Sequence, residues 1–268
     1  MANPGRFNIE HICKQLNITQ EERKEDVFLK KTESGVFFLV LNKKANTLSI
    51  PFIRKISNLL DKVEENEGPT ALVTFGLHEK FFSTGLDLNF MLSLEKEDVF
   101  GFILEVIRLY GRFLALPVPC IAMMNGHAYA GGCMLAFSHD YRIMRDDFGQ
   151  ICMNEVELHM PLPPGMNAVI QEKITDKDAF RELVLQAKRF ESKEAFERKM
   201  VNKIFPPEKL FEETLKFAES QTQFGVNKPN FRKLKEEMNK VAIDCCFNKG
   251  HGVGVKYESK VAFPNPKL

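Results

Sequence analysis

The sequence predicts an α/β fold in which strands and helices alternate around a largely parallel sheet. Short continuous apolar runs, such as residues 71–75 and 120–124, have the length of buried strands. Longer segments between them, such as residues 98–116, carry apolar residues at helical spacing. Strands without polar alternation are typical of parallel sheets that helices cover on both faces.

The first elements follow this alternation from residue 27 onward. Residues 27–30 and 35–41 are predicted to form two short strands around a turn. Residues 47–65 have the apolar spacing of a helix. Residues 71–75 form a strand that runs into Gly76.

The middle of the chain continues the pattern. A helix is predicted over residues 98–116, where Pro117 follows and stops it. A strand over residues 120–124 leads through a turn to a helix that begins with two glycines, and residues 141–144 form the next strand.

Beyond Ala168 the pattern is mainly helical, and it divides the chain into three parts. Helices are predicted over residues 178–188, 206–221 and 231–248. The expected organisation is an N-terminal appendage (1–26), a core (27–205) and a C-terminal helical region (206–268) suited to oligomerisation.

Composition excludes several classes of protein. The 268 residues are 44% hydrophobic and carry a net charge of +1, which gives no electrostatic reason to expect nucleic acid or an anionic membrane as a partner. No apolar run reaches the length of a membrane span, and the N-terminal residues lack the apolar core of a secretory signal. The six cysteines and six histidines show no metal-ligand spacing, so we expect reduced thiols in an intracellular protein and no metal.

Two adjacent glycines, Gly131 and Gly132, stand where a buried strand hands over to a helix. Backbone amides at such a turn can bind a phosphate or stabilise an oxyanion. The phosphate-loop motifs and the G-x-S-x-G nucleophile elbow are absent. Close packing of a helix on a strand remains the alternative reason for these glycines.

A second glycine turn follows the strand at residues 71–75. Together the two turns resemble the crotonase superfamily of enoyl-CoA hydratases and isomerases, whose motifs are F-x-[AS]-G-x-D-[LI] and N-G-x-A-x-G-G-[GC]. The chain has Phe82-Ser83-Thr84-Gly85-Leu86-Asp87-Leu88 and Asn125-Gly126-His127-Ala128-Tyr129-Ala130-Gly131-Gly132-Cys133. The resemblance covers residues 27–205 and continues through the segments 139–142 and 154–158.

The resemblance implies a crotonase-type ββα spiral core and an acyl-CoA substrate. By position, the amides of Leu86 and Gly131 form the oxyanion hole for the thioester oxygen, and a side chain at Gly131 or Gly132 would intrude on the thioester. It implies no cofactor apart from the coenzyme A that arrives on the substrate.

The choice of reaction depends on the acid and base groups. Hydratases of this family hold water between two glutamates, and here the first of these positions is Met134. The second matches Glu155. A single carboxylate in apolar surroundings suits a proton shuttle, so the chain is expected to be a Δ3,Δ2-enoyl-CoA isomerase of unsaturated fatty acid β-oxidation. The isomerase branch with an acid some ten residues later is not matched, since that segment reads Leu162-Pro163-Pro164-Gly165.

Other polar residues have alternative explanations. Glu157, two positions after Glu155 in a segment expected to be extended, would point to the opposite face. His127 and His159 could line the pocket or be structural, Cys133 is expected to be a packing residue, and Asp87 to fix its turn. Lys256 and Lys260 are weaker candidates for coenzyme A binding. The expected substrate-binding and coenzyme A-binding residues are Lys80, Phe82, Ser83, Gly85, Asp87, His127, Gly132 and Met134.

The final tripeptide, Pro266-Lys267-Leu268, is a variant of the S-K-L peroxisomal address. With the expected activity it predicts import by the peroxisomal receptor into the peroxisomal matrix. Self-association as a homotrimer or hexamer is expected. The alternatives are a hydratase or another acyl-CoA enzyme of this fold, and an acyl-CoA-binding relative without catalysis.

Overall fold

The computed structural model describes residues 7–247. Strand β2 (Val36–Leu41), which lies between β1 and β3 in the main sheet, is buried along its whole length. Phe37 and Leu39 face one hydrophobic core, and Phe38 and Val40 face another. Because successive side chains of a strand point to opposite faces, an unbroken apolar run can supply both cores at once.

The main sheet has six strands and contains every strand that the sequence predicts. The pair β1–β2 is antiparallel and all other neighbouring strands are parallel. In spatial order the strands are β1 (Val27–Lys31), β2, β3 (Ala71–Gly76), β5 (Cys120–Met124), β7 (Tyr141–Arg145) and β10 (Lys203–Phe205).

A second sheet of four short strands was not predicted. It places the exits of β3 and β5 side by side, because β4 pairs with β6 in parallel. These strands are too short to show an apolar period in the sequence. In spatial order they are β4 (Phe81–Ser83), β6 (His127–Tyr129), β8 (Gln150–Cys152) and β9 (Phe190–Glu191).

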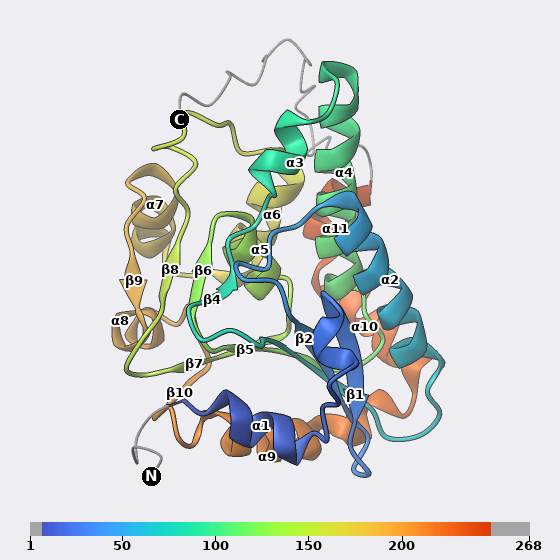
Figure 1. The fold of residues 1–268 in the computed structure, drawn as a ribbon. Coiled ribbons are helices and arrows are strands. Elements are labelled where there is room, and N and C mark those ends of the chain that lie inside the picture. The colour runs from blue at the N-terminus through green and yellow to red at the C-terminus, as the bar shows by residue number, and fades with distance from the viewer. Residues whose placement is uncertain (1–6, 248–268) are drawn as a thin grey trace.

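Helices cover both faces of the main sheet, as the fold class requires (Figure 1). Helices α1 and α9 lie beneath it in this view, and α2, α4 and α5 lie on the other face. The first six helices are α1 (Ile9–Gln15), α2 (Ile50–Glu65), α3 (Leu88–Leu92), α4 (Lys96–Leu114), α5 (Gly131–Phe137) and α6 (Pro164–Lys173). The others are α7 (Lys177–Leu185), α8 (Ser192–Glu197), α9 (Leu210–Gln221), α10 (Lys228–Met238) and α11 (Lys240–Phe247), with 3-10 turns at Glu22–Lys24 and Thr222–Gly225.

The N-terminal segment packs on the domain through buried side chains. Phe7, Ile12, Cys13 and Leu16 join Phe211 of α9 in the second core. The described part of the segment predicted as an appendage therefore contributes to the hydrophobic interior.

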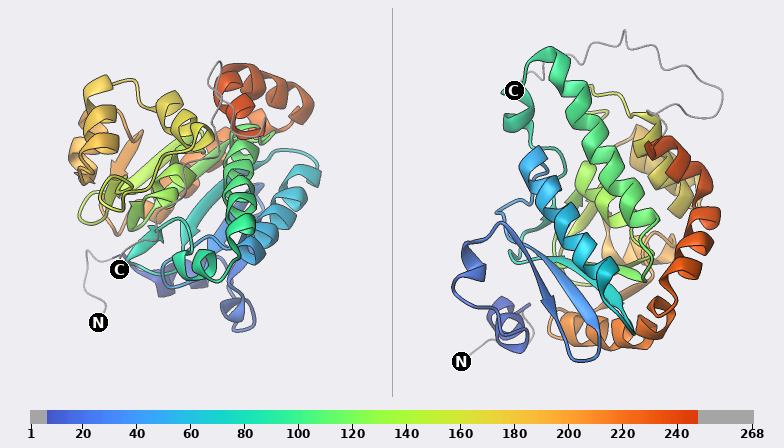
Figure 2. Two further views of the ribbon diagram at one scale, coloured as in Figure 1. Left: turned by 90° about the horizontal axis from the view of Figure 1, so that it is seen from above. Right: turned by 90° about the vertical axis from the view of Figure 1, so that its right-hand side faces the viewer.

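The single helix predicted over residues 231–248 was wrong, because the chain forms two helices that meet at Asn239. The buried Asn239 amide donates to the carbonyl of Leu114 at 3.1 Å, and its oxygen accepts from Lys173 Nζ at 2.9 Å. Helix α11 then packs on α4 and α6 (Figure 2).

A buried ion pair also fixes the C-terminal helices. Lys235 of α10 places its ammonium 2.8 Å from the carboxylate of Asp140 and 3.2 Å from the carbonyl of Phe113. The amide of Cys120 donates to the same Asp140 oxygen at 2.9 Å. The pair joins α10 to the starts of β5 and β7.

No helix within residues 7–247 is long and apolar enough to cross a membrane. The same part of the chain contains no group of three acidic, cysteine or histidine side chains placed to hold a metal ion. The predicted tripeptide address, Lys256 and Lys260 lie outside the described residues.

Candidate functional site

The first glycine turn is built by backbone bonds to the segment before α2. Thr84 donates to the carbonyl of Ala45, and Asp87 donates to that of Leu48. Leu48 in turn donates to the carbonyl of Gly85 at 2.7 Å. These bonds fix the residues on either side of Leu86.

Side chains complete this turn. The buried Ser83 hydroxyl donates to the carbonyl of Asn46 and accepts from the amide of Gly85. Asp87 caps α3 by accepting from the amide of Phe90, and it also accepts from Thr47. Partial burial acts to raise the pKa of Asp87, but the Phe90 amide, Thr47 and Lys43 outweigh it and leave that pKa below its usual value. An ionised, bonded carboxylate of this kind organises the turn.

The second turn joins β6 to α5. Asn125 accepts from the amide of Gly76 and donates to its carbonyl, so the exits of β3 and β5 are tied together. Ala130 donates to the carbonyl of Cys152 at 2.8 Å and has φ of +47°. Gly131 and Gly132 begin α5 and are buried.

The two turns meet backbone to backbone. A Cβ built on Gly132 would lie 2.0 Å from the carbonyl oxygen of Ser83. A Cβ on Gly131 would lie 2.8 Å from the Tyr110 hydroxyl and 3.3 Å from the amide nitrogen of Leu86. The protein itself therefore fills the space that a side chain would need, which is the close packing that the sequence left open as an alternative.

The amides of Leu86 and Gly131 lie together at this junction. Among the described residues neither amide donates a hydrogen bond to another backbone group, whereas the amides of Asp87 and Ala130 do. Two free amides at one point can bind an oxyanion.

A cavity of about 430 Å³ opens at these amides. One side is apolar and includes flexible methionine side chains, which adapt to the shape of a ligand. The apolar lining residues include Leu86, Leu88, Ile103, Met134, Leu158, Met160 and Met166. The polar ones are Thr47, Thr84, Asp87, Asn89, Tyr129, Asn154 and Glu155.

Glu155 is the unusual group in this cavity. Its Oε2 atom is buried and has no hydrogen-bond partner in the described part of the chain. Burial raises the pKa of Glu155 from 4.5 to about 7. A carboxyl in this condition can take and return a proton near neutral pH.

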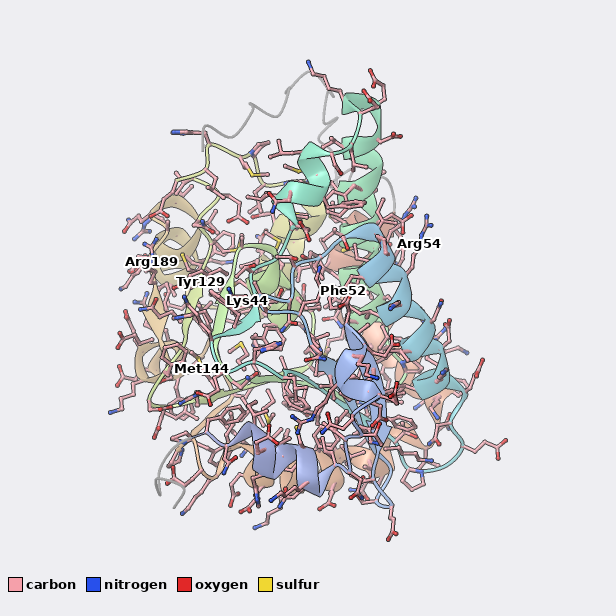
Figure 3. The ribbon with its side chains drawn as sticks, in the orientation of Figure 1. Lys44, Phe52, Arg54, Tyr129, Met144 and Arg189 are labelled. Carbon is pink, nitrogen blue, oxygen red and sulfur yellow. The ribbon has the colours of Figure 1, made fainter. Side chains whose placement is uncertain are left out.

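The segment around Glu155 is a helical turn rather than the extended chain that was predicted. The amides of Glu157 and Leu158 both donate to the carbonyl of Asn154, and that of Met160 donates to the carbonyl of Glu155. The carboxylate of Glu157 points to the surface and pairs with Arg189 at 3.1 Å. Figure 3 shows Arg189 with Tyr129 on the side of the second sheet.

His159 ends this turn with φ of +53°, a left-handed conformation that glycine adopts without strain.

The remaining predicted residues are not among those that line the cavity. Phe82, Ser83, Gly85 and Gly132 build the turns, and Lys80 is exposed beside Phe81. His127 packs among Phe81, Tyr129 and Phe148, and its pKa is lowered by burial and by Lys80. Burial raises the pKa of the Cys133 thiol well above its usual value, as expected of a packing residue.

Another cavity, of about 490 Å³, lies between α2, α4, α10 and α11. Its lining is charged, and Glu64 there pairs with both Arg112 and Arg232. Sequence analysis gave no sign of it, because its charges come from separate helices.

Two glycine turns that meet beside a cavity holding a largely buried carboxyl are the features of an α/β protein with a small-molecule site. The sequence pattern of the Enoyl-CoA hydratase/isomerase family matches residues 31–245, and the chain belongs to that family. It has the crotonase fold, a ββα core followed by C-terminal helices.

Relatives within the family include both isomerases and hydratases. The chain is 36% identical over 151 residues to Enoyl-CoA delta isomerase 3 of Arabidopsis thaliana, covering 53% of this chain and 61% of that protein. It is 33% identical over 148 residues to the peroxisomal Enoyl-CoA delta isomerase 2 of the same plant, covering 53% and 62%. The mitochondrial Enoyl-CoA hydratase of Pongo abelii is 26% identical, with 87% and 77% covered.

Among solved structures, human mitochondrial delta3-delta2-enoyl-CoA isomerase superposes with a TM-score of 0.74 at 23% identity, covering 82% of this chain and 85% of that one. The matches to the two plant isomerases span less than two thirds of those proteins.

Proposed function

We propose that the protein is a Δ3,Δ2-enoyl-CoA isomerase in which Glu155 carries the proton. The observation that carries the proposal is the Glu155 carboxyl, whose Oε2 atom is buried without a hydrogen-bond partner among residues 7–247 and whose pKa is raised to about 7, in a cavity that also holds Met134. A thioether neither donates nor accepts a proton, so no second acid stands at Met134 to activate water. The similarity to two plant delta isomerases supports the same reaction.

In this mechanism the thioester oxygen of a 3-enoyl-CoA accepts from the amides of Leu86 and Gly131. The Glu155 carboxylate removes a proton from C2, and the electron pair of that C–H bond moves into a dienolate whose charge rests on the thioester oxygen. Electrons then return through the conjugated system to C4, which takes the proton from the Glu155 carboxyl. The double bond now lies between C2 and C3, and the base is ionised again. Preorganised amides stabilise the dienolate more than the ground-state carbonyl, which lowers the barrier.

Product analysis with 3-hexenoyl-CoA tests the proposal. The expected product is 2-trans-hexenoyl-CoA, and Glu155→Gln should lower kcat by at least about 10³ while acyl-CoA binding persists. The surface variant Glu157→Gln is the matched control and should keep full activity. A 3-hydroxyacyl-CoA product would identify a hydratase instead, and binding without turnover would identify a non-catalytic relative.

A single carboxyl that moves the proton predicts one further signature. In D2O, part of the product should retain the substrate's own C2 proton at C4. Complete exchange with solvent would mean that the carboxyl exchanges its proton with water before C4 takes one, and it would contradict direct transfer of the same proton.

The same proposal includes three further predictions: coenzyme A contacts of Lys80 and His127, self-association, and a peroxisomal location.

Exposed apolar side chains on the C-terminal helices, among them Leu234, Met238 and Val241, support self-association, and light scattering tests it. Similarity to the peroxisomal Enoyl-CoA delta isomerase 2 of Arabidopsis thaliana supports a peroxisomal location, and a fluorescent fusion with a free C-terminus tests it.

A further inference from the structure

Ala130 has a backbone conformation that is unusual for any residue but glycine. Its φ is +47° and its ψ is −124°. Steric clashes of a side chain make this combination of φ and ψ energetically costly. Residues other than glycine keep it only where the surrounding structure enforces the conformation. Ala130 directly precedes Gly131, so its ψ decides where the Gly131 amide points.

Three hydrogen bonds hold this linkage. The carbonyl of Ala130, which shares a peptide unit with the Gly131 amide, accepts from the amide of Met134 at 3.2 Å. The other two bonds lie on either side of that peptide unit. The Ala130 amide donates to the carbonyl of Cys152 at 2.8 Å. On the other side, the hydroxyl of Tyr110 donates to the carbonyl of Gly131 at 2.8 Å. Tyr110 belongs to α4 and is fully buried. It is not among the residues that line the described cavity.

We infer that Tyr110 is a positioning residue, whose hydroxyl holds the strained Ala130–Gly131 linkage so that the Gly131 amide faces the cavity. The inference rests on the proposed function, because it assigns the Gly131 amide to the thioester oxygen. Tyr110 acts through Gly131 and touches no reacting atom.

The surroundings of Tyr110 keep it a hydrogen-bond donor. Burial, and after it the charge of Glu155, raise the pKa of Tyr110 well above its usual value. The hydroxyl therefore stays protonated while Glu155 changes its charge. Tyr110 lies on a 19-residue helix, and its ring is packed in the hydrophobic core. The hydroxyl is therefore held in place and does not move with the Ala130–Gly131 turn.

Kinetics of Tyr110→Phe are the first test. Removing the hydroxyl should lower kcat about tenfold and leave KM within about twofold. The Gly131 amide would be misplaced, and its hydrogen bond to the thioester oxygen matters most in the transition state, where that oxygen carries negative charge. Tyr141→Phe is the matched control, since the Tyr141 hydroxyl meets Gln221 at 3.4 Å on the far side of the sheet. An unchanged kcat in Tyr110→Phe would overturn the inference.

A double-mutant cycle with Ala130→Gly separates positioning from general stability. Glycine adopts the Ala130 conformation without strain, so the linkage no longer needs the tether. Tyr110→Phe should therefore cost less than about threefold in kcat when Ala130 is already glycine. Equal losses in both backgrounds would overturn the inference. So would a fall in Tm for Ala130→Gly, which is the usual effect of replacing alanine with glycine.

A spectroscopic measurement distinguishes this inference from the proposed function. Butanoyl-CoA labelled with 13C at the thioester carbonyl has no double bond to move, so its bound carbonyl shift reports only hydrogen bonding. We expect a downfield shift in the wild type, a smaller one in Tyr110→Phe and recovery in the double variant. Equal shifts in wild type and Tyr110→Phe would overturn the tether and leave the isomerase proposal intact. A wild type that shows the expected shifts but does not isomerise 3-hexenoyl-CoA would overturn only the isomerase, and a wild type without any carbonyl shift would overturn both.

Discussion

A methyl group on Gly85 would lie 2.4 Å from the amide nitrogen of Gly131. The two turns that carry these residues therefore fit only when both present bare backbone. Gly85→Ala should separate the turns, lower kcat at least about 10²-fold and cost about 1–3 kcal/mol of stability beyond its control.

Gly68→Ala is that control, because Gly68 has φ of +85° against +81° for Gly85, yet a Cβ there meets nothing within 4 Å. Both variants carry the same backbone strain, and only one carries the clash. Thermal unfolding and turnover of 3-hexenoyl-CoA measure the difference. Equal losses of stability and of kcat in the two variants would contradict the close backbone contact between the turns.

Glu155 should make the folded protein less stable as the pH rises. Its pKa is about 7 when folded and 4.5 in the reference state, so the protonated form is favoured by folding. The contribution is fully favourable below 4.5 and is lost through about 7, a difference of about 3 kcal/mol. Glu155→Gln should thus be more stable than wild type at pH 8, with the advantage absent at pH 4. Urea unfolding measures this, and an advantage independent of pH would contradict the burial of the charge.

The same carboxyl predicts the pH dependence of the reaction. A base must be ionised to accept a proton, so kcat/KM should rise with pH and level off above about 7. Initial rates from pH 5 to 9 with 3-hexenoyl-CoA give the profile. A flat profile would assign proton removal to another group.

Met134 should control the choice between isomerisation and hydration. It is buried and lines the cavity with Glu155. Met134→Glu adds a second acid, and we expect some 3-hydroxyacyl-CoA product with a loss of about 2–3 kcal/mol in stability from the buried polar group. Met134→Gln is the uncharged control. Hydration by both variants, or by neither, would remove Met134 from this role.

The buried pair of Lys235 and Asp140 predicts a large effect on stability. Lys235→Met leaves the Asp140 carboxylate without its cation and should cost about 3–5 kcal/mol. The double variant Lys235→Met with Asp140→Asn should recover part of this loss, since no buried charge is left alone. Guanidinium unfolding of the wild type, the two single variants Lys235→Met and Asp140→Asn, and the double variant measures the coupling. A stability loss in the double variant equal to the sum of the two single losses would contradict it.

The sequence was sufficient to predict the elements whose signals are local. Strands β1, β2, β3, β5 and β7 and helices α2 and α4 carry apolar patterns of their own, and the glycine motifs mark both turns. Strands β4, β6, β8, β9 and β10 were missed because two or three residues show no period, and pairing with distant segments makes them strands.

The site was predictable only as far as chemistry appears in residue types. Glu155 was predicted to be the base from its position in a motif. The prediction of an extended backbone around it was wrong. Tyr110 was predicted only as part of an apolar helical stripe, because its partner Gly131 lies on another element. The second cavity and the break at Asn239 likewise depend on contacts between distant helices.

Helix α11 packs on α6, which supplies Met166 to the wall of the cavity. This contact has a consequence for synthesis on the ribosome. Every residue that lines the cavity lies between Thr47 and Met166. However, Gly165 of α6 packs so closely on Cys245 that an added Cβ would lie 3.0 Å from its carbonyl oxygen. A nascent chain will therefore have emerged with all of its reactive groups well before the helix that supports their wall. Newly made protein should complete its site late, only after α11 has been synthesised and has packed on α6.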